Sequence, residues 1–296
     1  MKISTIFSQA STKGKPVLSF EIFPPKKKKT PSQQDFQSLL DTVNNLATLA
    51  PDFVSITYGA GGTNSEGSLE LAEHVKNQGM VALPHFTAIG YPLEEISGYL
   101  ETLVNKGFEN VLALRGDLPE NPTKADLIWR DFLHASDLIK VISRDFPGFC
   151  IGGAAYPEGH KESVYAGQDI EVLKFKENLG VEFFVTQLFF NNNNFIKFLE
   201  NARNQGVTSP IFAGVMPVLS PKFVEKIVEL SGVQLPRELA AACNNYGHDE
   251  VEFKKRAKDF CIRQGNDLLE RGVDGIHLYT MNRYSDIKEI VNDLSI

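Results

Sequence analysis

Short apolar runs of strand length alternate with amphipathic, helix-like segments along the whole chain. Helical periodicity is clear in residues 35–50, 68–78 and 94–106. The connection before the last apolar run is the longest and carries an extra segment, LPRELAAACNN (235–245). The pattern predicts a single (β/α)8 TIM barrel over residues 1–296, with an extra helical segment before the last strand. The expected strands are residues 17–23, 52–58, 80–86, 110–116, 149–156, 181–188, 210–215 and 275–280.

Alternation within these strands predicts which side chains share a face, because successive residues of a strand point to opposite sides. The helix-facing set is apolar, and the barrel-facing set is expected to be small or polar. The residues expected to face inward are Ser19 and Glu21; Ser55 and Thr57; Ala113, Arg115 and Asp117; Gly152, Ala154 and Tyr156; Val185 and Gln187; His277 and Tyr279. Their polar ends converge at the carboxyl end of the barrel, where active sites of this fold lie. Glu21 is then a candidate site residue, because a closed barrel has no exposed edge strand.

Charge and cysteine content limit the class of protein. A net charge of −7 argues against a nucleic-acid or membrane-surface binder, and Lys26–Lys29 are expected to form a solvated loop. The three cysteines (150, 243 and 261) show no CxxC spacing, which indicates a reducing compartment without a disulfide framework or a metal site. No apolar run approaches the ~20 residues of a membrane helix, and the N-terminus does not resemble a signal peptide. We therefore expect a cytoplasmic protein.

Two motifs that contain glycine are candidates for cofactor binding. YGAGGTN (58–64) follows a strand, but Asn64 replaces the third glycine of a dinucleotide-binding loop. A glycine-rich loop that lets a cofactor approach the backbone remains open. In LRGD (114–117), Arg115 and Asp117 form either an ion pair at the barrel rim or a phosphate-binding cation beside a carboxylate for a heterocycle.

Further polar groups follow the fifth, sixth and eighth expected strands. AAYPEGH (154–160) supplies Tyr156 and His160. Gln187 in TQLFF (186–190) offers both a donor and an acceptor to a heterocycle, whereas Arg283 in YTMNR (279–283) suits a ligand carboxylate. The helix after His160 forms either a solvated face or a positive rim through its charged residues, Asp169, Lys174 and Lys176.

Seven motifs in this order resemble the methylenetetrahydrofolate reductase family, from about Ser19 to Arg283. They are SFEIFPP, SITYGAGG, PHFTAIG, LALRGD, AAYPEGH, VTQLFF and LYTMNR. The chain is similar to the short bacterial form, a catalytic barrel without a regulatory domain. The resemblance implies an FAD-containing oxidoreductase of one-carbon metabolism and methionine biosynthesis, which reduces 5,10-methylenetetrahydrofolate to 5-methyltetrahydrofolate with NADH or NADPH. It also implies a homo-oligomer.

The resemblance assigns roles to four residues. Glu21 matches the general acid, which activates the bridging methylene by protonation so that the five-membered ring opens to an iminium that accepts hydride from the reduced flavin. Asp117 matches a catalytic carboxylate near the flavin pyrimidine edge and the pterin. Gln187 matches a pterin contact, and Arg283 matches a contact to the benzoyl-glutamate end.

The remaining matches are cofactor contacts. The implied FAD-binding residues are Thr57, Tyr58, Ala60, His85, Arg115, Gly116, Asp117, His134, Ala135, Tyr156, His160, Asp169 and Lys176. The chain departs from the family pattern in TNSEGS (63–68), His134, Val172, Phe175 and Ile227, which bears on FAD affinity and nicotinamide use. Two alternatives stay open: a folate-binding redox subunit that takes electrons from a partner protein, and another FAD-dependent barrel oxidoreductase.

Overall fold

The structure is a computed structural model that describes residues 1–24, 33–58, 65–116, 132–231 and 233–296. Two of the predicted site residues, Ala60 and Asp117, lie outside the described residues. The lysine cluster 26–29 and the first two residues of TNSEGS also lie outside them.

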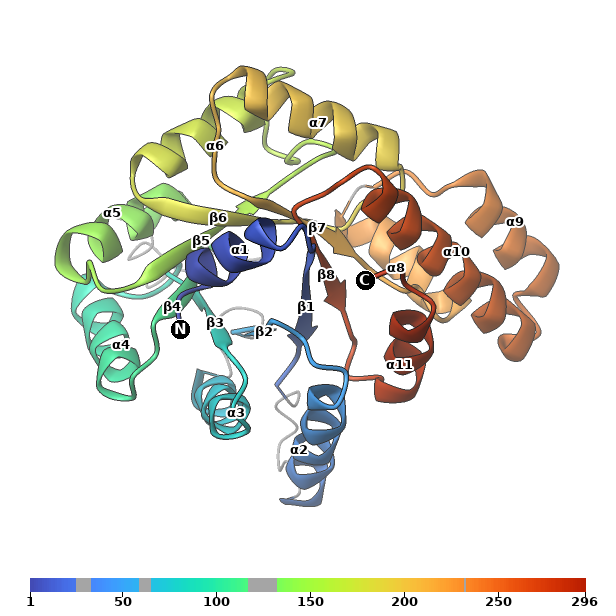
Figure 1. Ribbon diagram of the computed structural model, residues 1–296, viewed down its shortest axis with the longest axis horizontal. Helices are drawn as coiled ribbons and strands as arrows, with labels where there is room; N and C mark the ends of the chain where they lie inside the picture. Colours follow the sequence, from blue (N-terminus) through green and yellow to red (C-terminus); the bar gives the residue numbers. More distant parts are fainter. Residues whose placement is uncertain (25–32, 59–64, 117–131, 232) are drawn as a thin grey trace.

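Eight parallel strands form a closed barrel in which each strand pairs with its neighbours in sequence and β8 pairs with β1 (Figure 1). The predicted (β/α)8 fold is therefore confirmed. The strands are β1 (Val17–Ile22), β2 (Phe53–Ile56), β3 (Ala82–Thr87), β4 (Asn110–Leu114), β5 (Cys150–Ala155), β6 (Val181–Thr186), β7 (Ile211–Val215) and β8 (Gly275–Tyr279).

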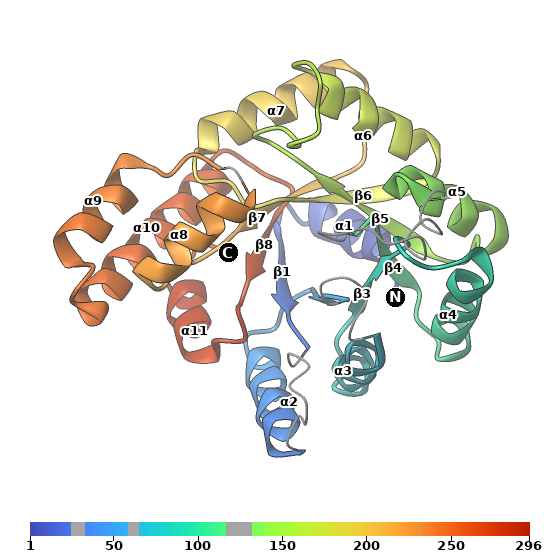
Figure 2. The same cartoon turned by 180° about the vertical axis from the view of Figure 1, so that it is seen from behind.

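Helices surround the strands, and the connection from β7 to β8 carries α8, α9 and α10. Figure 2 shows this group beside β7 and β8, where α9 packs on α10. The predicted extra helical segment is thus α9. The helices are α1 (Ile3–Thr12), α2 (Gln33–Ala47), α3 (Ser65–Asn77), α4 (Leu93–Asn105), α5 (Ala135–Asp145), α6 (Gln168–Asn178), α7 (Asn192–Asn204), α8 (Pro221–Ser231), α9 (Arg237–Tyr246), α10 (Glu250–Glu270) and α11 (Tyr284–Asn292).

The N-terminal helix α1 is not among the elements that the sequence pattern predicts. Ile3 and Ile6 pack against side chains inside the barrel, and the Ile3 amide donates to Asn110 Oδ1 at the start of β4 (2.8 Å). Figure 1 shows α1 in the middle of the ring formed by the other helices. It therefore covers the amino end of the barrel and leaves the carboxyl end for a site.

The barrel interior is more apolar than the alternation suggested. Phe53, Phe183 and Phe212 fill its amino-terminal half, with ring centroids 5.6 to 6.2 Å apart. The inner face is thus not uniformly small or polar, because large rings share it with Ser19 and Gly152.

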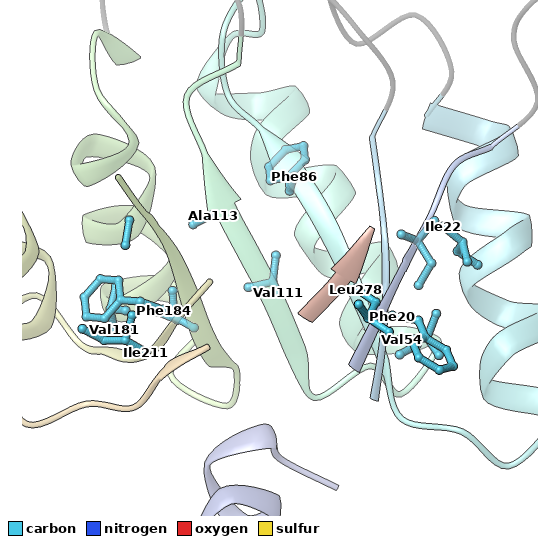
Figure 3. Close-up of a cluster of buried hydrophobic side chains, with 14 of the residues drawn as sticks. Phe20, Ile22, Val54, Phe86, Val111, Ala113, Val181, Phe184, Ile211 and Leu278 are labelled. Atoms are coloured by element: carbon cyan, nitrogen blue, oxygen red, sulfur yellow. The ribbon is translucent and has the colours of Figure 1, made fainter. Parts of the chain in front are cut away.

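The predicted facing of β4 is wrong. Leu112 belongs to the interior cluster, whereas Val111 and Ala113 belong to the layer between strands and helices (Figure 3). Parallel strands buried on both faces carry apolar residues on both, so side-chain size does not identify the inner face. Arg115 therefore reaches the carboxyl end of the barrel because β4 ends at Leu114, not because of its strand parity.

Candidate active site

A cavity of about 1310 Å³ opens at the carboxyl end of the barrel. Its walls come from the segments that follow β1 to β5 and β8, from the start of α5, from α6, and from Lys226 of α8. The closed barrel gathers here side chains that are far apart in the sequence. The lining includes every described residue that the sequence predicted for cofactor binding: Thr57, Tyr58, His85, Arg115, Gly116, His134, Ala135, Tyr156, His160, Asp169 and Lys176.

Gly116 shapes the cavity wall after β4 through its backbone. Its φ of +95° is a left-handed conformation that favours glycine. A Cβ at this position would lie 2.6 Å from Ile89 Cγ2. The turn that presents Arg115 to the cavity therefore requires glycine.

Arg115 forms an ion pair at the rim, with a partner that the sequence did not indicate. Its guanidinium donates to both carboxylate oxygens of Glu162, at 2.7 and 2.8 Å. These hydrogen bonds hold the pKa of the Glu162 carboxyl below its usual value. Both side chains line the cavity, so an anion that binds Arg115 would compete with Glu162.

Lys176 is not part of a solvated helix face. Its ammonium group is buried and donates to the Ala154 carbonyl oxygen at 3.0 Å. Burial lowers the pKa of Lys176 to about 8, an effect that Asp169 partly opposes. Lys174, by contrast, pairs with Glu177 at 2.7 Å and does not line the cavity.

Asp169 organises the loop that follows β5. Its carboxylate accepts from the His160 amide at 3.1 Å and from the Ser163 hydroxyl at 3.0 Å. The His160 ring meets Tyr156 edge to face, with centroids 4.6 Å apart. Burial lowers the pKa of His160, so this ring is an uncharged part of the wall near pH 7.

One wall of the cavity is apolar where the family pattern is polar or basic. Val172 and Phe175 on α6 line the cavity and remain 39% and 46% exposed. The Lys140 ammonium lies 5.7 Å from the centroid of the Phe175 ring. Val172 and Phe175 would therefore contact a ligand through apolar surface, with the Lys140 ammonium as the positive charge behind them.

Glu21 lies beside the cavity, with only 7% of its surface exposed. Its Oε2 is 3.6 Å from His85 Nε2 and 3.7 Å from His277 Nε2. Burial lowers the pKa of His85 to about 4, although the Glu21 carboxylate acts in the opposite direction. His85 is therefore neutral at pH 7, and it lines the cavity, whereas Glu21 lies next to it and is not part of the lining.

Two buried polar atoms of the cavity wall lack hydrogen-bond partners among the described residues. They are His85 Nε2 and Thr87 Oγ1, both on β3. Buried polar groups are usually paired, so this part of the wall fits a ligand that carries hydrogen-bonding groups.

The two predicted substrate residues Gln187 and Arg283 are not part of the cavity lining. Both are exposed at the carboxyl end of the barrel, after β6 and at the N-cap of α11. The Gln187 Oε1 accepts from the Leu188 amide at 2.9 Å. Ile227, which departs from the family pattern, is buried in a separate apolar cluster with Met216 and Val218.

Several lining residues are missing from the sequence prediction, notably Lys161, Glu162 and Lys226. Two of them belong to the loop after β5 and the third to the exposed side of α8, where neither strand alternation nor a motif marks them. The described residues contain no group of His, Cys, Asp and Glu side chains arranged to hold a metal ion. Within the same residues, no helix combines the length and apolarity needed to cross a membrane.

Comparison with known proteins identifies relatives over nearly the whole length. The family model of methylenetetrahydrofolate reductase matches residues 6–295. 5,10-Methylenetetrahydrofolate reductase of Escherichia coli (strain K12) is 30% identical over 277 residues, which cover 93% of this chain and 90% of the relative. A probable methylenetetrahydrofolate reductase (NADH) of Oryza sativa subsp. japonica is 30% identical over 307 residues, covering 100% of this chain and 51% of the relative. The chain thus spans about half the length of the plant relatives that it matches.

A solved structure supports the fold. An uncharacterized protein from Clostridium thermocellum, which binds two copies of 5-methyl-5,6,7,8-tetrahydrofolic acid, superposes with a TM-score of 0.67 at 19% identity. The match covers 97% of each chain. The resemblance inferred from the seven motifs is confirmed by the family model, and the chain belongs to the methylenetetrahydrofolate reductase family.

Proposed function

We propose that the protein reduces 5,10-methylenetetrahydrofolate to 5-methyltetrahydrofolate, with FAD bound in the cavity and NADH or NADPH as the electron donor. The observation that carries the proposal is the buried Glu21 carboxyl, held between two histidines beside the cavity that gathers the predicted cofactor residues. Membership of the family and the activity named for the Escherichia coli relative support the same reaction.

The cavity has the size and the polar groups that FAD requires. Its volume of about 1310 Å³ exceeds the ~300–1,000 Å³ typical of sites for smaller ligands. Arg115 and Lys176 would bind the pyrophosphate, and the unpartnered His85 Nε2 and Thr87 Oγ1 would meet polar atoms of the ring system. When bound, reduced FAD would supply the hydride that the folate carbon accepts.

Glu21 would supply the proton for the folate. A methylene bridge between two nitrogens opens only when one of those nitrogens is protonated, and a positioned carboxylic acid can do this. Its burial keeps bulk water from exchanging with that proton, and the neutral His85 ring adds no positive charge that would favour the ionised carboxylate and so remove the proton before it reaches the substrate. A buried carboxyl group beside a cavity of this volume supports a site that cofactor and substrate share.

The absorption spectrum of the purified protein tests the proposed function. We expect flavin bands that bleach with NADH or NADPH and return on addition of methylenetetrahydrofolate, and release of FAD on denaturation. Release of FMN alone, or a colourless protein that still turns over, would contradict the cofactor assignment. Flavin bands that bleach with neither nicotinamide would favour the redox-subunit alternative, with electrons from a partner protein.

Lys176 makes FAD binding depend on pH. Without a ligand its pKa is about 8, and a nearby pyrophosphate favours the ammonium form and so raises that pKa. Above pH 8 binding must then take up a proton, so the affinity of the apoprotein for FAD should fall by up to about tenfold per pH unit. Below pH 8 this group contributes no pH dependence.

Titration of the apoprotein with FAD between pH 7 and 9.5 measures this effect. Lys176→Met should bind FAD more weakly and lose the dependence above pH 8. Lys174→Met is the matched control, because that lysine lies on the same helix and pairs with Glu177 away from the cavity. An undiminished slope in Lys176→Met would show that another group takes up the proton.

A further inference from the structure

A completely buried histidine lies beneath Glu21, outside the lining of the cavity. His277 on β8 is 0% exposed, and its ring stacks on Phe53 with centroids 6.0 Å apart. Its Nδ1 is 2.7 Å from the Ser19 hydroxyl, and its Nε2 is 3.3 Å from the Ser55 hydroxyl. Both serines are themselves fully buried. The imidazole is therefore fixed in position and orientation by three strands and one aromatic ring.

Strand register explains why these groups meet. Ser19 pairs with His277 between β1 and β8, and Glu21 pairs with Ser55 between β1 and β2. All of these side chains point into the barrel, so Glu21 lies one residue pair closer to the carboxyl end than Ser19. The carboxylate is thus placed directly above the ring that the serines hold.

The contacts of His277 determine where its hydrogen lies. The Ser19 hydroxyl is 2.7 Å from Nδ1 but 3.4 Å from its alternative acceptor, the Ile276 carbonyl oxygen. Donation to Nδ1 leaves the hydrogen of a neutral imidazole on Nε2. When Glu21 is ionised, the opposite tautomer would turn the lone pair of Nε2 toward Oε2 of the carboxylate, which is repulsive. The favoured arrangement therefore directs an Nε2–H toward Ser55 and Glu21.

Both histidines approach the same oxygen of the carboxyl group. His85 Nε2 and His277 Nε2 lie 3.6 and 3.7 Å from Oε2 of Glu21. Both distances are longer than a hydrogen bond, and contacts of catalytic groups in ligand-free sites often tighten to hydrogen bonds only in the working complex. An Nε2–H donated to Oε2 occupies that oxygen as an acceptor, so a proton on the carboxyl group is left to Oε1.

We propose that His277 is a positioning residue for Glu21: through its Nε2–H it engages Oε2, so that Oε1 carries the proton transferred to the folate amine. This inference rests on the proposed function. A free carboxylic acid can hold its proton on either oxygen and can rotate, whereas transfer needs one oxygen at one place. Misplacement of a reacting group by about 1 Å can cost ~10²-fold in rate.

Apart from His85, whose Nε2 approaches the same oxygen, the other groups around Glu21 do not provide this contact. His85 faces it from β3 and Tyr279 from β8, and the Tyr279 hydroxyl is occupied in donating to the Thr186 carbonyl oxygen at 2.7 Å. From β2, Ser55 is uncharged, and the described inward residues of β4 are leucines. Tyr156 lies beyond Tyr279 and acts on it. His85 and His277 are thus the described groups whose ring nitrogens approach Glu21.

His277→Phe tests the proposal, because it keeps a ring on Phe53 but removes both nitrogens. An N–H donated to a carboxylate favours its ionised form, so loss of that donor should make Glu21 titrate at higher pH. We expect the rate of folate reduction by the flavin-containing enzyme to fall about tenfold to hundredfold. The alkaline limb of its pH–rate profile should move to higher pH. Bleaching of the flavin by the nicotinamide should keep its wild-type rate. His277→Gln, which can again offer an N–H, should recover part of the rate.

A second measurement needs neither cofactor nor turnover. Infrared titration of the carboxyl C=O band in the apoprotein, with Glu21→Gln as the blank, should show the same displacement in His277→Phe. If that variant does not fold, Ser19→Ala keeps the imidazole but removes its Nδ1 partner, and a smaller displacement in the same direction is expected. Two outcomes would contradict the proposal and leave His277 with a structural role alone. One is a folded variant in which neither the carboxyl C=O band nor the alkaline limb of the pH–rate profile moves. The other is an equal loss of rate in both half-reactions. If Glu21→Gln retains folate reduction, the acid role of Glu21 fails and the positioning role of His277 fails with it, whereas a wild-type protein that binds no flavin and reduces no folate would contradict the proposed function itself.

Discussion

Glu21→Gln should separate the two half-reactions of the enzyme. Glutamine keeps the size and polarity of the side chain at this buried position but has no transferable proton. Hydride transfer from a nicotinamide to the flavin needs no acid, so bleaching of the flavin should stay near the wild-type rate. Opening of the methylene bridge does need one, and folate reduction should fall by about 10²–10⁴-fold, the usual contribution of a positioned acid.

Stopped-flow absorbance of each half-reaction measures this separation. Glu182→Gln is the matched control, because it makes the same chemical change on β6 at a residue next to the inward-facing Phe183, and so on the opposite face. The control should leave both half-reactions unchanged. If Glu21→Gln slows both steps equally, or neither, the carboxyl group serves the structure and another group donates the proton.

The sequence predicted the architecture because each strand–helix unit has its own periodicity. It did not determine how neighbouring strands are aligned, and the site depends on that alignment. His277 and Glu21 were both expected to face inward, yet only the register of β8, β1 and β2 shows that Ser19 and Ser55 hold the ring below the carboxylate. Alternation gives the face of a residue, whereas contacts between strands need the register as well.

The errors in the predicted site have related causes. Ala113 was placed inside the barrel because it is small, but both faces of β4 are buried and both are apolar. Glu162 lies in a loop, where no period indicates the direction of a side chain, so its bidentate contact with Arg115 was not foreseen. The reading of Lys176 as part of a solvated face failed because Nζ turns inward to the Ala154 carbonyl. Periodicity therefore predicts strands better than it predicts rim side chains.

Phe183→Ala should cause a large loss of stability, because it empties part of the barrel interior. The ring is 0% exposed and packs against Phe53 and Phe212, with centroids 6.2 and 5.9 Å away. Truncation of a buried phenylalanine removes its apolar contacts and leaves a cavity, which together cost about 3–5 kcal/mol. Urea unfolding followed by far-UV circular dichroism and by fluorescence should show coincident transitions displaced to lower urea.

Gly152 provides the companion test of this packing. A Cβ at Gly152 would lie 2.5 Å from Cζ of Phe183, so Gly152→Ala should overpack the interior and cost about 1–3 kcal/mol. In the Phe183→Ala background the obstructing ring is gone and the remaining close atom is the terminal Leu112 Cδ1 at 2.9 Å, so the added methyl group should cost much less. The two free energies of unfolding should therefore be non-additive, because the residues are in contact. Additive losses would mean that β5 and β6 do not bring Gly152 and Phe183 together inside the barrel, and that the interior is packed differently from the arrangement described.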